Sequence, residues 1–438
     1  MSTIVIVGAG FAGVHVAREL ARLLPKEEDG QITLVDQHNF MVFTPMLTEV
    51  AGGEVDADHI VSAVRRLSPR ITFEQGRVDR IDLAAKRVTL TRAAADTAAP
   101  PERRTLEADH MVIALGAVTN FHGLSGVQEH ALTLKSVGDA AAIRNRALEL
   151  LDAAADEPDA ATRRAMLTFV VGGGGFSGVE TMAALNDLVR AVAKTYAPLR
   201  DTPIRTVLVQ PGKRLLPELN AGLARYAQQK LEQRGVEVIL NTEITGAGPD
   251  YTALEGDKRI PAHTLIWTAG VTPSPVIGTL DCRRGPHGGV VVDACCAVEG
   301  QRGVWALGDC AEIPHPGQKK TYAPTAQNAM REGTQVGRNI AAVLQGRQPQ
   351  PFVYTPIGEL ALVGRRSGVA SVYGVHLSGL VAWAMWRAIY LSKMPGLGKR
   401  VRIGLDWLLD LVFGREVAAL PLAPSVSSGD ATRATDQS

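Results

Sequence analysis

The sequence predicts an α/β fold with two Rossmann-like dinucleotide-binding domains and a C-terminal amphipathic helical region. Two βαβ units, each with a glycine-rich turn, cover residues 3–36 and 168–210. The chain has 438 residues, more than the roughly 250–300 that one hydrophobic core supports. Two or three domains are therefore expected.

The elements of the first unit follow from their residues. Residues 3–7 are β-branched and apolar, which is typical of a buried parallel strand. A glycine turn and a helix over 13–24 precede a second strand that ends at Asp36. We expect the N-terminus to be this first strand and not a signal peptide, because it lacks a basic region.

The second unit repeats this order. A strand covers 168–172, a helix runs from about 178 to 192, and a further strand ends at Gln210. The polar segment 152–164 is predicted to be an exposed connection, and 91–104 a hairpin or loop tip.

Composition excludes several classes of protein. The formal net charge is +1, so nothing favours nucleic acid as a partner. The four cysteines show no metal-like spacing, and we predict no metal site. No apolar run approaches the roughly 20 residues that a membrane-spanning helix needs.

The first glycine set predicts a nucleotide site. In Gly8-Ala9-Gly10-Phe11-Ala12-Gly13 the glycines permit a tight turn, close approach of a pyrophosphate, and packing of the helix on the strand. The helix N-terminus favours an anion. Asp36, which follows 23 residues after Gly13, can bond a ribose hydroxyl.

The second glycine set contains Gly173, Gly175 and Gly178, with Glu180 in the first helical turn. Glu180 is open to two interpretations: a carboxylate beside a nicotinamide, or a charge that complements the helix dipole. Further on, the strand VWAL stops at Gly308-Asp309, where an Asp can accept a hydrogen bond from a sugar-like hydroxyl. With two nucleotide folds present, this segment is interpreted as the second half of a domain that binds FAD.

The chain resembles the type II NADH:quinone oxidoreductases, which are single-subunit, non-proton-pumping flavoenzymes of respiratory membranes. The motifs that carry the resemblance are GAGFAG, NFMVFTPMLTEVAGG, LKSVGDAAAIRN, FVVGGGGFSGVE, LIWTAG, VWALGDCA, APTAQNAMREG and GELALVGRRSGVA. APTAQNAMREG discriminates best, because it separates this family from other flavoproteins with two nucleotide domains.

The resemblance implies a set of site residues and partners. Non-covalent FAD would lie on Gly8, Gly10, Gly13, Asp36, Pro45, Gly308, Asp309, Ala326 and Gln327. NADH, with NADPH as a second substrate, would lie on Gly173, Gly175, Gly178, Glu180, Gln210 and Gly270. Glu180, Gln327 and Arg331 are the catalytic candidates, with a quinone near Gln327. It further implies a homodimer and a peripheral position on the cytoplasmic face of the cell membrane.

The resemblance also implies a division of the chain. The FAD domain would cover 1–118 and 286–350, the NAD(P)H domain 119–285, a membrane or dimer region 351–416, and a disordered tail 417–438.

The sequence departs from the family pattern at four places. Met41 stands where His is usual, Arg331 replaces a second Gln one turn after Gln327, and Gln210 replaces a Glu. A Lys that the family places near the quinone has no clear match; His376 and Ser378 lie in that region. Gln327 itself is open to a second interpretation, as a capping or flavin-contacting amide.

The C-terminal region predicts two amphipathic helices separated by Met394-Pro395-Gly396. Apolar stripes and basic flanks suit a helix that lies in lipid headgroups. Packing on the protein's own core or on a second subunit is the alternative. The stripes consist of Leu380, Trp383, Trp386 and Tyr390, and of Val401, Leu405, Leu408, Leu409 and Val412. The basic flanks are Arg387, Lys393, Lys399, Arg400, Arg402 and Arg415.

Other functions remain open at this point. Sulfide:quinone and disulfide reductases need cysteines beside the flavin, and no cysteine precedes Cys282. Cys295-Cys296 is interpreted as part of a strand and not as a redox pair. Ferredoxin-type reductases share the two nucleotide folds but lack the AQNAMREG segment. A flavin-binding redox sensor or scaffold is the alternative from another class.

Overall fold

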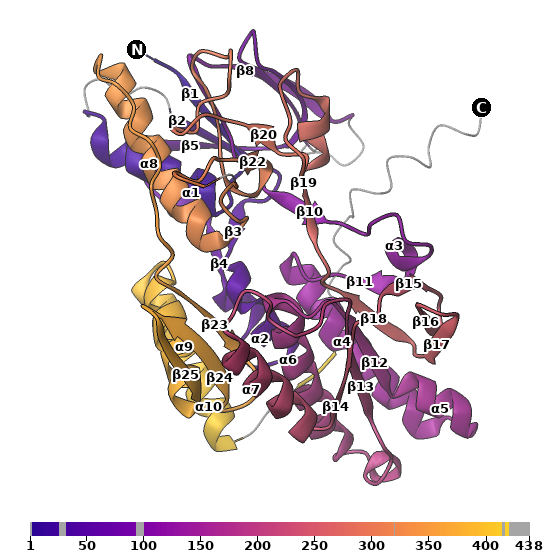
Figure 1. The fold of residues 1–438 in the computed structure, drawn as a ribbon. Coiled ribbons are helices and arrows are strands. Elements are labelled where there is room, and N and C mark those ends of the chain that lie inside the picture. The colour runs from indigo at the N-terminus through magenta and orange to yellow at the C-terminus, as the bar shows by residue number, and fades with distance from the viewer. Residues whose placement is uncertain (1, 26–31, 93–99, 319, 414–416, 420–438) are drawn as a thin grey trace, which may run out of the picture. The chain divides into compact units, whose positions relative to one another are not determined.

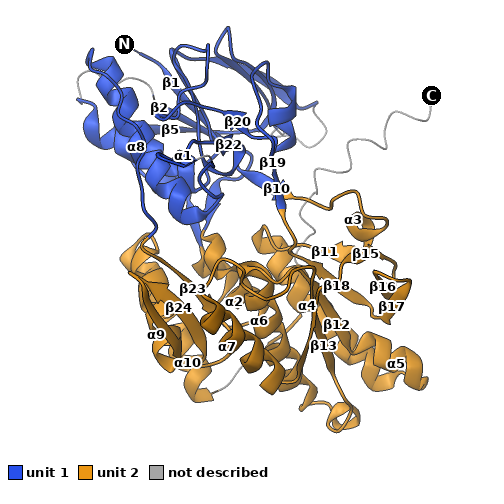
Figure 2. Cartoon of the chain, in the orientation of Figure 1, with its two compact units in different colours: residues 1–42, 61–118, 271–356 blue, residues 43–60, 119–270, 357–438 orange. Residues whose placement is uncertain are grey.

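The computed structural model describes residues 2–25, 32–92, 100–318, 320–413 and 417–419. The chain divides into two compact units (Figures 1 and 2). Unit 1 contains residues 1–42, 61–118 and 271–356, and unit 2 contains residues 43–60, 119–270 and 357–438.

Unit 1 is built on a five-stranded parallel sheet whose core strands are completely buried. Ile4, Val5, Ile6 and Val7 of the central strand are at most 1% exposed, as expected for a parallel strand covered on both faces. In sheet order the strands are β21 (Val304–Ala306), β9 (His110–Ile113), β1 (Ile4–Val7), β2 (Ile32–Asp36) and β5 (Ile71–Gln75). Helices α1 (Phe11–Leu23) and α8 (Ala326–Leu344) pack on each other.

Smaller sheets complete unit 1. An antiparallel sheet contains β6 (Arg77–Asp82), β7 (Arg87–Arg92) and β8 (Glu102–Glu107). Two-stranded pairs are formed by β3 (Phe40–Val42) with β4 (Val61–Ala63), and by β20 (Val290–Val291) with β22 (Ala311–Glu312). The predicted hairpin at 91–104 is confirmed by β7 and β8; its tip, residues 93–99, lies outside the described residues.

Unit 2 repeats the parallel design. Its sheet contains β11 (Ala131–Leu132), β18 (Thr264–Trp267), β12 (Thr168–Gly172), β13 (Arg205–Gln210) and β14 (Val236–Leu240), in that order. In both sheets the strand order reverses beside the strand that precedes the glycine turn, β1 or β12, and doubly wound folds bind ligands at such a switch point. The helices of unit 2 that precede its C-terminal part are α2 (Leu47–Ala51), α3 (Val127–His130), α4 (Val137–Asp156), α5 (Ala160–Met166), α6 (Phe176–Ala193) and α7 (Ala221–Gln233). An antiparallel sheet adds β15 (Ile244–Ala247), β16 (Tyr251–Leu254) and β17 (Lys258–Pro261).

The C-terminal part of unit 2 adds a sheet and two helices. Strands β23 (Gly358–Leu362), β24 (Gly368–Val372) and β25 (Val375–Gly379) are antiparallel. Helices α9 (Leu380–Lys393) and α10 (Leu397–Phe413) follow (Figure 1). Arg415 and all of the predicted tail except residues 417–419 lie outside the described residues.

Two findings differ from the expectations. The predicted connection 152–164 is largely exposed, as expected, but most of it is helical, because α4 continues to Asp156 and α5 begins at Ala160. Pro158 interrupts helical structure only locally, and the Asp159 side chain accepts the Thr162 N–H at 2.7 Å, which starts the new helix. The compact units also divide the chain differently from the expected domains: 43–60 and 357–438 join the second nucleotide fold, which ends at Gly270.

Candidate functional site

The first glycine turn, in unit 1, has the geometry of a phosphate cradle. A Cβ on Gly8, whose φ is +108°, would lie 2.2 Å from the Ala114 carbonyl oxygen, and one on Gly13 would lie 1.9 Å from the Gly8 oxygen. Gly10, in contrast, has nothing within 4 Å of its Cβ position. No side chain caps the N-terminus of α1. Two glycines thus bring helix and strand together, and the third leaves an open approach to free N–H groups.

Asp36 supports this turn from the end of β2. One carboxylate oxygen accepts the Ala9 N–H at 2.7 Å, and the other accepts the His38 N–H at 2.8 Å. Burial raises the pKa of Asp36, although these backbone hydrogen bonds oppose the shift. Because each oxygen keeps a second lone pair, Asp36 can still accept a ribose hydroxyl.

The second glycine turn, in unit 2, repeats the first. A Cβ on Gly178 would lie 1.8 Å from the Gly173 oxygen, whereas Gly175 has nothing within 4 Å of its Cβ position. The φ of Gly173 is +108°, as for Gly8. No side chain caps the N-terminus of α6. The second turn thus has the same geometry as the first.

Gln210 holds the position that Asp36 holds in the first fold. Its Oε1 accepts the Gly174 N–H at 2.7 Å. Because a backbone N–H can only donate, the amide oxygen must face the turn, and the NH₂ group remains as a donor. Each nucleotide fold thus has the same hydrogen bond from its glycine turn to the side chain at the end of its second strand. The two folds differ in the charge of that side chain, which is an acid in the first and an amide in the second.

Glu180 has partners that neither sequence interpretation anticipated. Its Oε1 accepts hydrogen bonds from the Leu362 N–H at 2.9 Å and from Trp386 Nε1 at 3.1 Å. Burial raises the pKa of Glu180 to about 8, although both hydrogen bonds oppose the shift. The residue therefore connects the start of α6 to the C-terminal sheet and to α9. A role beside the nicotinamide stays a prediction.

The Gly308-Asp309 turn is held by a residue that the sequence analysis missed. Gly308, Asp309 and Cys310 form a 3₁₀ turn, with the Gly308 φ at +73°. The Glu332 carboxylate on α8 accepts the Gly308 N–H at 2.8 Å, and burial raises its pKa to about 7. Glu332 and Asp309 line the same small cavity. The sequence signal that could have identified Glu332 is that an acidic residue occurs on the apolar face of an amphipathic helix.

Gln327 and Arg331 meet at a tyrosine. Both are on α8, where Ala326 is the first residue. Gln327 Nε2 donates to the Tyr354 hydroxyl, and the Arg331 guanidinium lies 5.4 Å from the centre of the Tyr354 ring. Tyr354 was not predicted, because nothing in its local sequence places it opposite α8. The Thr325 side chain caps this helix, so capping is not the function of Gln327.

The remaining candidates are placed as follows. Pro45 lies in a 3₁₀ turn (Thr44–Met46) of unit 2, whereas Met41 is buried in β3 of unit 1. Gly270 follows β18 with φ +125°, and a Cβ there would lie 3.0 Å from His122 Nε2. The structure thus assigns Pro45 to a different unit from the other residues predicted to hold FAD.

The four cysteines are free thiols. Cys296 and Cys310 are fully buried. Burial raises the pKa of Cys310 to about 12 and that of Cys296 well above its usual range, so both remain protonated. Within the described ranges, no group of three or more His, Cys, Asp or Glu side chains could hold a metal ion.

The C-terminal helices divide the predicted amphipathic residues into buried and exposed sets. On α9, Trp386 is 1% exposed, and Tyr390 packs edge-on against Phe43 and tilted against Trp386. The side chain of Arg387 is 8% exposed. Its interpretation as a basic flank is wrong, because it lies between the rings of Trp383 and Trp407, at 4.2 and 4.5 Å.

The predicted stripe on α10, by contrast, is uncovered. Each of its side chains is more than half exposed: Val401, Leu405, Leu408, Leu409 and Val412. The opposite face contributes Ile403 and Trp407 to the interior. Among the described residues, no helix is long and apolar enough to cross a membrane.

The observed geometry fits FAD in unit 1 and a nicotinamide dinucleotide in unit 2. Each unit has an uncapped helix N-terminus, a glycine open on the ligand side, and a polar residue at the end of the second strand. Unit 1 adds Asp309 beside a small cavity. Asp36 and Asp309 would hold the hydroxyl groups of FAD, and Gln210 would contact the ribose of the nicotinamide dinucleotide.

Comparison with known proteins defines the class. The family model for the pyridine nucleotide-disulphide oxidoreductases matches residues 2–333, and the model for the NDH2 C-terminal domain matches residues 357–416. The chain belongs to the pyridine nucleotide-disulphide oxidoreductase family.

Individual relatives narrow the class further. A protein named probable NADH dehydrogenase, from Dictyostelium discoideum, is 27% identical over 95% of this chain and 91% of its own length. The type II NADH:quinone oxidoreductase NdhA of Mycobacterium tuberculosis is 29% identical over 92% and 86%. The structure of NDH2 from Plasmodium falciparum in complex with NADH is 19% identical, covers 95% of this chain and 99% of that one, and has a TM-score of 0.85. Over nearly its whole length the chain is thus similar to type II NADH:quinone oxidoreductases, and its residues 357–416 match the C-terminal domain model of NDH2.

Proposed function

We propose that this enzyme oxidises NADH and delivers the two electrons, by way of FAD, to a membrane quinone without proton pumping. The observation that carries the proposal is the repeated cradle: two glycine turns of one construction, one anchored by an acid and the other by an amide. The family relationship supplies the direction of electron flow. The balanced reaction is NADH + H⁺ + quinone → NAD⁺ + quinol.

The side chains have distinct tasks in this reaction. FAD, when bound, supplies the two-electron redox chemistry of the reaction. The N-termini of α1 and α6 bind the two pyrophosphates, while Asp36 and Asp309 orient FAD through its hydroxyls. Glu332 positions Asp309, because it fixes the backbone of the turn that carries it. Gln210 contacts the ribose of NADH and leaves NADPH acceptable as a second substrate.

We place quinone contact at Gln327, with Arg331 as a second polar group. Both side chains converge on Tyr354. An amide and a phenol can hydrogen-bond a quinone carbonyl, and a nearby guanidinium favours the negative charge that develops on a reduced oxygen. Glu180, with its raised pKa, is proposed to act as a protonated carboxyl near the nicotinamide.

The exposed stripe on α10 supports peripheral attachment to a membrane. Leu405, Leu408 and Val412 present apolar surface, and Lys399 and Arg402 lie on the same helix. An apolar stripe with basic neighbours suits anionic headgroups, and a quinone is dissolved in the bilayer. We assign the stripe to the cytoplasmic face of the cell membrane. Burial of the stripe in a homodimer is the competing possibility.

A kinetic matrix tests the proposed activity. NADH and NADPH are each assayed against ubiquinone and menaquinone analogues, with the FAD-loaded protein. Steady turnover with at least one quinone supports the proposal. Rapid flavin reduction by NADH with negligible quinone turnover would instead favour a redox sensor. Turnover with a ferredoxin but with no quinone would favour a ferredoxin-type reductase.

The membrane assignment needs point substitutions, because removal of α9 and α10 would also remove the buried Trp386, Arg387 and Trp407. We expect Leu405→Glu combined with Leu408→Glu to release the protein from liposomes that contain anionic lipid. Matched changes on the exposed surface of α7, Gln229→Glu and Gln233→Glu, should not. Undiminished liposome binding, or conversion of a dimer to a monomer in sedimentation, would assign the stripe to a subunit interface.

A further inference from the structure

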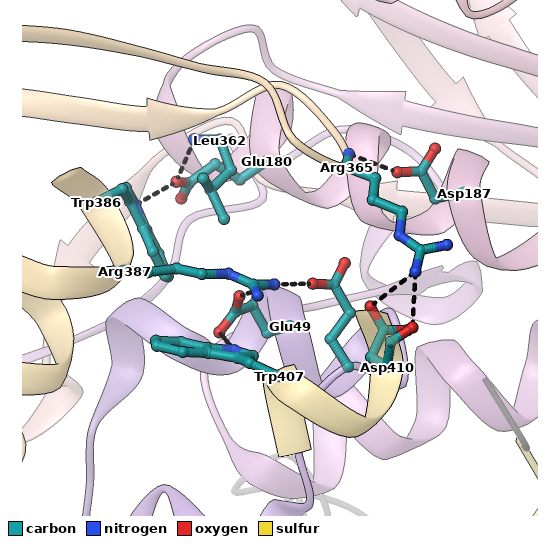
Figure 3. A network of polar contacts seen from close by, with 10 residues as sticks. Glu49, Glu180, Asp187, Leu362, Arg365, Trp386, Arg387, Trp407 and Asp410 are labelled. Carbon is teal, nitrogen blue, oxygen red and sulfur yellow. Dashed lines mark hydrogen bonds and ion pairs between the residues drawn. The ribbon is translucent and has the colours of Figure 1, made fainter. Parts of the chain in front are cut away.

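Glu49, Glu54 and Glu180 form a cluster of carboxyl groups inside unit 2, and the first two contact the buried guanidinium of Arg387 (Figure 3). Arg387 donates to the Glu54 carboxylate at 3.0 Å, and its nearest nitrogen lies 3.7 Å from Glu49 Oε1. The Glu49 side chain is 2% exposed. Trp407 Nε1 donates to Glu49 Oε2 at 3.2 Å. Glu49 thus has the longer of the two contacts to the cation.

Glu49 is poorly compensated as an anion. Its Oε1 atom accepts no hydrogen bond from the described residues, and among them Arg387 is the only cation within 4 Å of it. Burial, and then the Glu54 carboxylate, raise the pKa of Glu49 well above its usual range; Arg387 and the Trp407 hydrogen bond oppose this, and Glu180 adds to it. A buried carboxyl without sufficient compensation keeps its proton.

Glu180 is the second buried carboxyl of the cluster, and unlike Glu49 it has no nearby cation among the described residues. In the described part of the chain, no basic side chain lies within 4 Å of its carboxylate, which is held by Leu362 N–H and Trp386 Nε1. Helices α2 and α6, which carry Glu49 and Glu180, pack on each other. The Glu180 charge also raises the pKa of Glu49. Because repulsion between two anions is mutual, ionisation of either carboxyl opposes ionisation of the other.

Other charged groups face the cluster from the elements that pack on it. Asp187 on α6 is paired with Arg234, and it also accepts the Arg365 N–H at 2.9 Å. Arg365 lies 3.7 Å from Asp410 of α10, where Asp406 is paired with His59 at 2.5 Å. The remaining groups are Arg144 of α4, which interacts with Asp56, and Tyr390 of α9, which interacts with Glu180.

We propose that Glu49 is a positioning residue for the proton chemistry of this enzyme: it keeps its proton at neutral pH and, as a coupled acid with Glu180, sets the charge of that residue. The proposal rests on the proposed function, since each turnover takes one proton from solution in addition to the hydride. Because Trp407 belongs to α10, the seating of that helix also tunes the proton affinity of Glu49.

The test is an infrared pH titration of the FAD-loaded enzyme, which follows the carbonyl stretch of protonated carboxyl groups. Besides the band of Glu332, whose pKa is about 7, the wild type should lose two such bands in two separate steps as the pH rises. Glu49→Gln, which keeps the Trp407 hydrogen bond, and Glu180→Gln should each leave one of these two steps. That step should lie at a lower pH than the upper step of the wild type, because the repulsion between the two acids is gone.

The matched control is Glu237→Gln, which removes an exposed carboxylate paired with Arg205 and should leave both steps unchanged. The pH profile of flavin reduction by NADH should lose its upper inflection in Glu49→Gln. The proposal would be overturned if Glu49→Gln kept both of the bands assigned to Glu49 and Glu180. It would also be overturned if each remaining step lay at the same pH in the single variants as in the wild type. An unchanged kinetic profile would overturn it as well. Because the infrared titration needs no turnover, it is informative even if the proposed quinone reductase activity fails.

Discussion

The amide of Gln210 predicts that NADPH is an appreciable substrate, although NADH remains the better one. In a nucleotide fold an acid at the end of the second strand binds the ribose 2′-hydroxyl and repels a 2′-phosphate. Here the Gln210 oxygen is committed to the Gly174 N–H, so the NH₂ group is the donor available to a ligand. Gln210→Glu should keep the anchor to Gly174 and replace that donor by a negative charge.

The magnitude follows from charge separation. Two unit charges about 4 Å apart repel by about 1 kcal/mol at the dielectric constant of water and by about 4 kcal/mol at an effective value of 20. Gln210 is partly exposed, so the lower repulsion energy, about 1 kcal/mol per pair of unit charges, applies. A phosphate with a charge of about −1.5 to −2 then costs roughly 1.5 to 2 kcal/mol. This corresponds to a loss of tenfold or more in kcat/KM, since 1.4 kcal/mol is tenfold.

The assay is kcat/KM for NADH and for NADPH, in the wild type and in Gln210→Glu, at two salt concentrations. The value for NADH should change by less than about threefold, and the loss with NADPH should shrink at high salt because exposed charges are screened. Gln233→Glu on α7 provides the same change of charge at the surface. If the wild type ignores NADPH and the variant changes nothing, Gln210 does not govern the choice of cofactor.

Three further predictions concern the flavin, the pH dependence and the thiols. Asp309→Ala should purify without FAD while its circular dichroism stays that of the wild type; a yellow, FAD-replete variant would contradict the role of this turn. The pKa of Glu180 is raised to about 8, so the folded state binds more protons than the unfolded state between pH 4.5 and 8, and stability falls as the pH rises through that window. Glu180→Gln can accept the same two hydrogen bonds, so its Tm should fall less than that of the wild type between pH 6 and pH 9. Equal falls in Tm for the two proteins would refute this. Replacement of Cys282 and Cys295 by Ser, and of the buried Cys296 and Cys310 by Ala, should leave quinone reduction within a few-fold; loss of turnover in a folded, FAD-loaded quadruple variant would revive a thiol mechanism.

The sequence predicts the parts of the fold that depend on local pattern. Strands 4–7 and 168–172 are apolar runs before glycine turns, strand 205–210 is an apolar run that ends at Gln210, and the structure confirms all three. The error at 152–164 arose because a single proline between two charged helices resembles a loop. Local pattern also could not show that residues 43–60 belong with the second nucleotide fold, because that depends on packing between distant segments.

The same limit applies to the candidate site. The glycine turns, Asp36 and Gln210 were predicted because each has a fixed spacing in a nucleotide fold. Glu332, Tyr354 and Glu49 were not, because their partners lie far away in the sequence: Gly308, Gln327 and Trp407, respectively. Arg387 was misassigned for a related reason. A basic residue beside tryptophans has the same pattern whether it faces solvent or is stacked between two indole rings.

The stacked guanidinium has a practical consequence for spectroscopy. Three of the five tryptophans, Trp383, Trp386 and Trp407, belong to the C-terminal helices, and two of them contact Arg387. Intrinsic fluorescence is therefore weighted towards these helices. Undocking of α9 or α10 would move indoles from a dry, cation-lined environment into water, so the emission would shift to the red. The enzyme thus contains its own optical reporter of how its C-terminal helices are seated, and no label is required.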